Sequence, residues 1–267
     1  MTPLAARHPR LALSGASALG SLRNRLSHRW PSPDQVRSLF PQLAPSAASR
    51  VAWSIGALEA RNRLLVDGIR QAGLGPVRML VRTPAAFAAL RPPLLLGTFH
   101  VGAMQALGVA IERLPGPVLV MRLGSLYTPS PPVEAVSTEG DDQRRAAAFR
   151  RALVHLAGGG FVVLALDIAP GPGLRAPCLG RTLELARGPF ALARLTGAPL
   201  RPLVARWRRS AVEVEVGETL AGGFASGAEA RESDLAAAAA RWLERYLLKS
   251  PAELGLGLLR VLLNGET

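Results

Sequence analysis

The feature that most constrains the fold is a short run, residues 94–98 (Leu-Leu-Leu-Gly-Thr), in which apolar residues do not alternate with polar ones. Such a run is typical of a strand that is buried on both faces of a sheet. The segment after it has apolar residues at helical spacing, at Met104, Leu107, Ala110 and Ile111. His100 therefore lies where a buried strand ends and a helix begins. In open α/β sheets this edge is where ligands bind.

The rest of the chain repeats this alternation. The predicted strands are 94–98, 118–121, 161–166, 179–185, 200–207 and 212–216. The predicted helices are 47–72, 85–90, 101–113, 143–157, 188–196 and 234–248, and the polar stretch 124–141 is predicted to be a loop. This order predicts an α/β fold, with a mainly parallel central sheet flanked by helices and an N-terminal helical extension.

Composition divides the chain near residue 46. Residues 1–46 contain six arginines and one acid, Asp34, with frequent serine and proline. We predict a basic, partly helical arm that lies on a membrane surface. A floppy basic tail and an organelle transit peptide are alternatives for the same composition. Residues 47–267 are predicted to form one α/β domain, because a chain of 267 residues that is 49% hydrophobic can bury one large core.

The net charge is strongly positive, at +13. A basic surface attracts nucleic acid, anionic lipid or an acidic protein. Lys249 is the one lysine, so a GC-rich coding sequence that favours arginine is an equal explanation. Aromatic residues make up 5% of the chain, which weakens the nucleic-acid hypothesis. The single cysteine, Cys178, excludes an internal disulfide, and no apolar run is long enough for a transmembrane helix.

His100 is the first candidate for chemistry. A histidine at a strand end can titrate near neutral pH and act as a general base, although most such histidines are satisfied by a backbone group. Common catalytic motifs are missing: the sequence has no G-x-S-x-G elbow, Walker A loop, H-E-x-x-H or Cys-x-x-Cys. The general base hypothesis therefore needs support from the segments around His100.

Four segments, in order, resemble one family. They are Thr98-Phe99-His100-Val101-Gly102, the strand 161–166 that ends at Asp167, the stretch 178–202 with its Gly-Pro-led helix and Thr-Gly-Ala-Pro turn, and the helix and proline at 242–251. Together they are similar to the lysophospholipid acyltransferase superfamily, and most similar to its lipid A (lauroyl/myristoyl) biosynthesis branch. The resemblance covers roughly residues 47–252.

The sequence departs from the family's pattern at one position. In the family an acid five residues after the histidine holds the imidazole, whereas this chain has Gln105 there. The amide oxygen of Gln105 can accept a hydrogen bond from the ring but supplies no negative charge. Three consequences stay open: reduced activity, a substitute acid such as Asp167, or a non-catalytic role.

The resemblance implies roles for particular residues. His100 would be the general base, and Gln105 would orient it. The expected substrate-binding residues are Arg122, Asp167, Gly180 and Arg181. Of these, Arg122 and Arg181 would bind phosphates of the acceptor, with solvated arginines as the alternative. Asp167 would bind an acceptor hydroxyl or act as the missing acid.

The implied activity is transfer of a fatty acyl chain from a thioester to a hydroxyl of a membrane lipid or glycolipid. The thioester, on acyl carrier protein or coenzyme A, is a co-substrate, and no metal or other cofactor is expected. The expected partners are a lipid acceptor, the acyl donor and an anionic membrane surface, with no nucleic acid. The location would be peripheral, on the cytoplasmic face of the inner or plasma membrane. The alternatives are a non-catalytic lipid- or acyl-binding protein and a basic nucleic-acid-binding protein.

Overall fold

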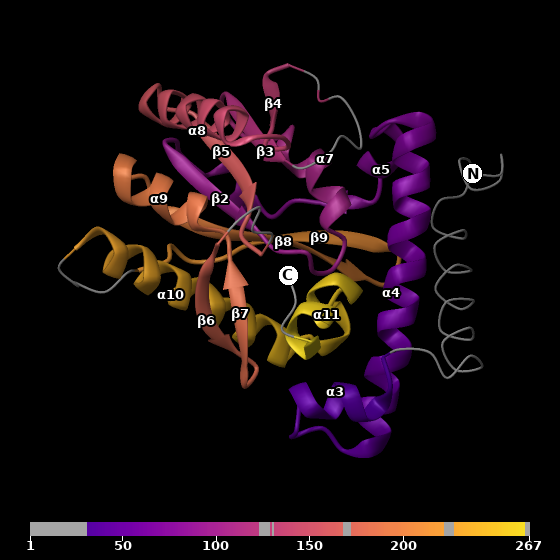
Figure 1. Ribbon diagram of the computed structural model, residues 1–267. Coiled ribbons are helices and arrows are strands. Elements are labelled where there is room, and N and C mark those ends of the chain that lie inside the picture. The colour runs from indigo at the N-terminus through magenta and orange to yellow at the C-terminus, as the bar shows by residue number, and fades with distance from the viewer. Residues whose placement is uncertain (1–30, 123–128, 130, 168–171, 222–226, 265–267) are drawn as a thin grey trace.

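The computed structural model describes residues 31–122, 129, 131–167, 172–221 and 227–264. Within these residues one seven-stranded sheet lies between layers of helices (Figure 1). Its strands, in spatial order, are β1 (Val81–Arg82), β9 (Ala211–Val216), β8 (Leu200–Arg208), β2 (Leu94–Thr98), β5 (Phe161–Ala165), β3 (Val118–Arg122) and β4 (Val133–Ser137).

The sheet is parallel except at one pair. β2 lies at its centre and pairs in parallel with β5 on one side and β8 on the other. β8 and β9 are antiparallel, whereas the pairings β3–β5, β3–β4 and β1–β9 are parallel. All five residues of β2 are buried, as its unbroken apolar run predicted. The predicted fold class, a mainly parallel sheet flanked by helices with an N-terminal helical extension, is confirmed.

Helices cover both faces of the sheet (Figure 1). The helices are α3 (Pro33–Leu39), α4 (Pro45–Ala72), α5 (Gly75–Arg78), α6 (Ala85–Ala88), α7 (Leu107–Ile111), α8 (Asp142–Ala157), α9 (Arg187–Thr196), α10 (Ala228–Lys249) and α11 (Leu256–Asn264), with 3-10 turns η1 (Met104–Ala106) and η2 (Pro251–Glu253). One layer of the core packs α8, α9, α10, α11 and α3 against the sheet, and the other packs α5, α6, α7 and part of α4.

Strand β4 and the hairpin β6–β7 differ from the sequence prediction. β4 lies within the stretch 124–141, predicted as a loop; it is an edge strand, and its exposed Glu134 weakens the apolar pattern. β6 (Leu174–Cys178) and β7 (Arg181–Leu185) form an antiparallel hairpin outside the main sheet. β7 starts two residues later than predicted, because Leu179 and Gly180 form the turn with φ of 52° and 70°.

The N-terminal arm is only partly described, since residues 1–30 lie outside the described residues. Its last part is folded. α3 begins with a capping box in which Ser32 and Gln35 exchange hydrogen bonds. Its Val36 and Leu39 are buried in the same core as the sheet. Residues 31–46 therefore belong to the folded body, and the predicted division at residue 46 does not mark its edge.

The segment after His100 is less helical than predicted. In place of one helix over 101–113, a 3-10 turn (η1) leads into the short helix α7. Gly102 has φ of +58°, and Ala103 has ψ of 47°, so the chain turns sharply before it becomes helical. The histidine is thus carried on a loop between β2 and η1.

Candidate active site

Two side chains meet at the carboxyl edge of the sheet. Thr98, the last residue of β2, pairs with Ala165, the last residue of β5, and two residues later in each chain segment come His100 and Asp167. The amide of Leu166 donates to the carbonyl of Thr98 (2.8 Å), which holds the two strand ends together. The strand register therefore places His100 beside Asp167.

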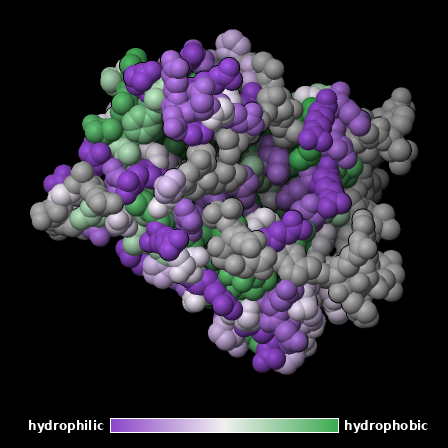
Figure 2. All heavy atoms as spheres, in the orientation of Figure 1, coloured by the Kyte–Doolittle hydropathy of each residue, from purple (hydrophilic) through white to green (hydrophobic). Residues whose placement is uncertain are grey.

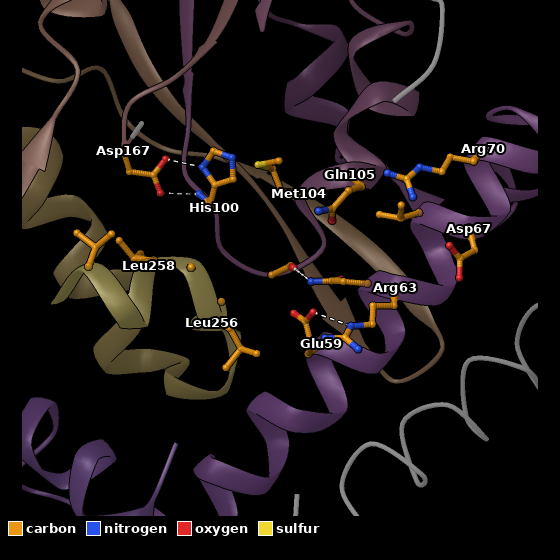
Figure 3. Close-up of a pocket in the computed structure, with 16 residues that line it drawn as sticks. Glu59, Arg63, Asp67, Arg70, His100, Met104, Gln105, Asp167, Leu256 and Leu258 are labelled. Carbon is orange, nitrogen blue, oxygen red and sulfur yellow. Dashed lines mark hydrogen bonds and ion pairs between the residues drawn. The ribbon is translucent and has the colours of Figure 1, made fainter. Parts of the chain in front are cut away.

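His100 and Asp167 are joined by two hydrogen bonds (Figure 3). His100 Nδ1 lies 2.8 Å from Asp167 Oδ1, and the backbone amide of His100 donates to Oδ2 at 2.8 Å. The Asp167 side chain is 2% exposed and that of His100 is 30% exposed. An ionised carboxylate only accepts hydrogen bonds, so in the neutral ring Nδ1 carries the proton and Nε2 keeps the lone pair.

The environment shifts the histidine's titration. Burial by itself lowers the pKa of His100, but the hydrogen bond and the negative charge of Asp167 outweigh it, so the pKa lies above its ordinary value. A raised pKa makes Nε2 a stronger base once the ring is neutral. The pair thus has the arrangement of a general base held by a carboxylate.

Gln105 does not have its predicted role. The structure gives the Nδ1 position to Asp167, and Gln105 Oε1 is buried with no hydrogen-bond partner among the described residues. The reason is local: the turn at Gly102 and the 3-10 geometry of η1 replace the helix that was to carry Gln105 back toward the ring. The substitute acid considered from the sequence, Asp167, is the residue that contacts His100.

His100 and Asp167 open into a pocket with a volume of about 550 Å³. Three parts of the chain enclose it: the middle of α4, the loop and turn after β2, and the start of α11 (Figure 3). Figure 2 shows this face hollowed between the hydrophilic flank of α4 and hydrophobic residues near α11. A site of this size suits part of a small-molecule substrate.

The α4 wall of the pocket is charged. One stripe of the helix faces the pocket, at Glu59, Asn62, Arg63, Val66, Asp67 and Arg70. Arg63 Nε donates to Glu59 Oε1 at 2.9 Å, so these two charges neutralise each other. Asp67 and Arg70 make no ion pair with another described residue, and Arg70 extends toward Gln105 (Figure 3). Arg70 is therefore a positive charge available to a ligand in the pocket.

The opposite wall is mostly apolar. It is formed by Leu256, Leu258 and Val261 of α11, with Met104 beside His100. Two glycines, Gly255 and Gly257, keep the start of this helix narrow. A Cβ at Gly255 would lie 2.5 Å from the carbonyl oxygen of His100, so α11 packs directly on the loop that carries the histidine.

The structure does not bring the other predicted binding residues into this pocket. Arg122 ends β3, while Gly180 and Arg181 lie at the turn of the β6–β7 hairpin, and none of the three lines the pocket. Arg63 and Arg70 line it instead. Sequence reasoning missed them because a charged stripe on a long helix looks the same whether it faces solvent or a site.

Cys178, the one cysteine of the chain, is buried. Burial, together with the charge of Glu244, raises the pKa of the Cys178 thiol to about 12, so it is no nucleophile near neutral pH. No group of three or more metal-ligating side chains occurs among the described residues. In the same residues no helix has the length and apolar character needed to cross a membrane.

No protein-family model and no curated protein matches the chain. The fold is similar to the crystal structure of the 1-acyl-sn-glycerophosphate (LPA) acyltransferase PlsC from Thermotoga maritima, with a TM-score of 0.43 and 13% sequence identity. The alignment covers 92% of this chain and 98% of that chain. A likeness this distant carries no argument about activity.

Proposed function

We propose that the chain is an acyltransferase that moves a fatty acyl group from a thioester to a hydroxyl of a membrane lipid, with His100 as general base. The observation that carries this proposal is the His100–Asp167 pair, in which Nε2 of the ring has no hydrogen-bond partner among the described residues, beside a pocket with one charged and one apolar wall. The segments that resemble the lysophospholipid acyltransferases, above all residues 98–102 around His100, supply the reaction class.

The proposed step needs no covalent enzyme intermediate. The acceptor hydroxyl gives its proton to His100 Nε2 as its oxygen attacks the thioester carbonyl carbon. The carbon–sulfur bond then breaks, and the imidazolium returns the proton to the departing thiolate. Asp167 keeps the ring in the tautomer with Nδ1 protonated and stabilises the imidazolium that forms.

The two walls suggest how the substrates lie. The acyl chain would follow the apolar side chains of α11, since burying each CH₂ group contributes about 0.8 kcal/mol. An anionic group of the acceptor would bind Arg70, which takes over the role predicted for Arg122 and Arg181. The donor is a thioester of acyl carrier protein or coenzyme A. The lipid A-like segments make a hydroxylated glycolipid one of the acceptors to test.

We further propose a peripheral location on the cytoplasmic face of the inner or plasma membrane. The net charge of +13 supports binding to an anionic surface. The residues expected to form most of the basic arm, 1–30, lie outside the described part of the chain. The non-catalytic alternative rested on Gln105, and the contact between Asp167 and His100 weakens that motive.

The test is an acyl transfer assay with the full chain. Labelled acyl donors of both classes are offered with lysophospholipid and glycolipid acceptors. Replacing a general base lowers a rate by about 10²–10⁴-fold, so His100→Ala should lose turnover by that factor. The control is His155→Ala, because His155 is a half-buried histidine on α8 that does not line the pocket. Wild-type turnover in His100→Ala would show that the base is assigned wrongly.

A further inference from the structure

Asn62 lies on the stripe of α4 that faces the pocket, and both ends of its side-chain amide form hydrogen bonds. Its Nδ2 donates to the carbonyl oxygen of Gly102 at 2.8 Å, and its Oδ1 accepts from Trp207 Nε1 at 3.1 Å. The indole N–H can only donate and a carbonyl can only accept, so the orientation of the amide is fixed. One side chain thus joins three elements: α4, the loop after His100, and β8.

The loop that Asn62 contacts also forms two backbone hydrogen bonds with other segments. The amide of Gly102 donates to the carbonyl of Glu253 (2.8 Å), and the amide of Ala103 donates to the carbonyl of Ala205 (2.7 Å). A Cβ at Gly102 would lie 2.1 Å from the carbonyl oxygen of Ala205, so the loop touches β8 directly. Of these three contacts with the loop, the hydrogen bond from Asn62 is the one that a side-chain substitution can remove.

We propose that Asn62 is a positioning residue that fixes the loop carrying His100, so that the imidazole keeps its place between Asp167 and the acceptor hydroxyl. The inference rests on the proposed function. Gly102 is separated from His100 by one residue, so a shift of the Gly102 carbonyl moves the backbone amide that bonds Asp167 Oδ2. Displacing a reacting group by about 1 Å can cost about 10²-fold in rate.

A positioning role has a signature that a purely structural role lacks. The hydrogen bond to Asp167 raises the pKa of His100. A looser loop weakens this hydrogen bond, so the pKa of His100 should fall. The other charged side chains around His100 are not substituted in an Asn62 variant. They are Glu59, Arg63, Asp67 and Arg70 on the pocket wall and Glu253 behind the loop.

The experiment compares Asn62→Ala with Leu65→Ala in the full chain. Leu65 lies one turn away on α4, is buried in the core, and does not line the pocket. Asn62→Ala should lower kcat about 10–100-fold with little change in KM, and move the acid limb of the pH profile to lower pH. Asn62→Gln, which keeps both amide functions, should recover part of the rate. Leu65→Ala should lower the melting temperature while kcat and the pH profile stay unchanged.

A second readout works without turnover. The pKa of His100 is measured by NMR on histidine-labelled protein, with His100→Ala to assign the signal among the four histidines. A lower pKa in Asn62→Ala but not in Leu65→Ala supports the inference even if no acceptor is turned over, in which case only the proposed function fails. The same pKa and kcat in both variants, with only stability lost, would overturn the positioning role.

Discussion

His100 and Asp167 are 67 positions apart in the chain, yet two hydrogen bonds of 2.8 Å join them. The distance is closed by strand register, because β2 and β5 are parallel neighbours that end at paired residues. Each side chain follows its strand by two positions, so neither needs a long loop to reach the other. The acid of the pair therefore comes from the neighbouring strand, and the turn after the histidine is left free to line the pocket.

Replacing the acid tests this arrangement. Asp167→Asn removes the charge that favours the protonated ring and allows the wrong tautomer of His100. In a serine-protease triad the corresponding change costs about 10⁴-fold in kcat, and we expect a loss of about 10²–10⁴-fold here. The pKa of His100 should fall because its raising partner is gone, so the acid limb of kcat/KM moves to lower pH. Rate measurements across pH check both effects, and an unmoved acid limb would speak against the pair.

At position 105, in contrast, we expect that a change of charge does not alter the mechanism. Asp167 already occupies Nδ1, so Gln105→Glu should not raise the rate. The new carboxylate would place a charged oxygen where Oε1 is buried without a partner in the described structure. Leaving a buried polar group unsatisfied costs about 1–3 kcal/mol, and more for a charge, so the melting temperature should fall. Gln105→Met, of similar volume but without charge, should keep stability. A faster Gln105→Glu enzyme would return Gln105 to the mechanism.

The inner strands of the sheet and the edge that carries the candidate site were predictable from the sequence, whereas the outermost strands β1 and β4 were not. The unbroken apolar runs at 94–98 and 161–166 predicted buried strands, and the polar residues after them predicted where a site would lie. The partner of His100 was not predictable in the same way. The spacing along the chain favoured Gln105 as the partner of His100, whereas the register between β2 and β5 places Asp167 beside the ring.

The walls of the pocket depend on packing that the sequence does not encode locally. Arg70 belongs to a charged stripe whose partner surface is set by how α4 lies against η1 and α11. The resemblance suggested Arg122 and Arg181 as binding residues, but neither a strand end nor a sequence match says which edge of which sheet a residue faces. Three-dimensional contact is the information that was missing.

Arg70 is expected to bind the acceptor. Arg70→Gln should raise KM for a phosphorylated acceptor about 10–100-fold, because a hydrogen bond to a charged group contributes about 1.5–3 kcal/mol. KM for the acyl donor should stay unchanged. The control is Arg50→Gln, because Arg50 is exposed on the same helix and does not line the pocket. Steady-state kinetics with each substrate varied in turn decide the matter; a rise in donor KM alone would place the donor's phosphates at Arg70.

Glu253 is expected to make the protein less stable as the pH rises. Burial raises the pKa of this carboxyl from 4.5 to about 7, and the amide of Trp207 and the charges of nearby arginines only partly offset it. The folded state therefore holds the proton more tightly than the unfolded chain, and stability declines as the pH rises from about 4.5 to about 7. Glu253→Gln removes this dependence, so its melting temperature should exceed that of the wild type by more at pH 8 than at pH 5. This difference in the free energy of unfolding is up to about 3 kcal/mol, at about 1.4 kcal/mol per pH unit.

The control is Glu218→Gln, because Glu218 is an exposed glutamate, and thermal unfolding of both variants is measured at both pH values. An equal gain for Glu253→Gln at pH 5 and pH 8 would contradict the raised pKa.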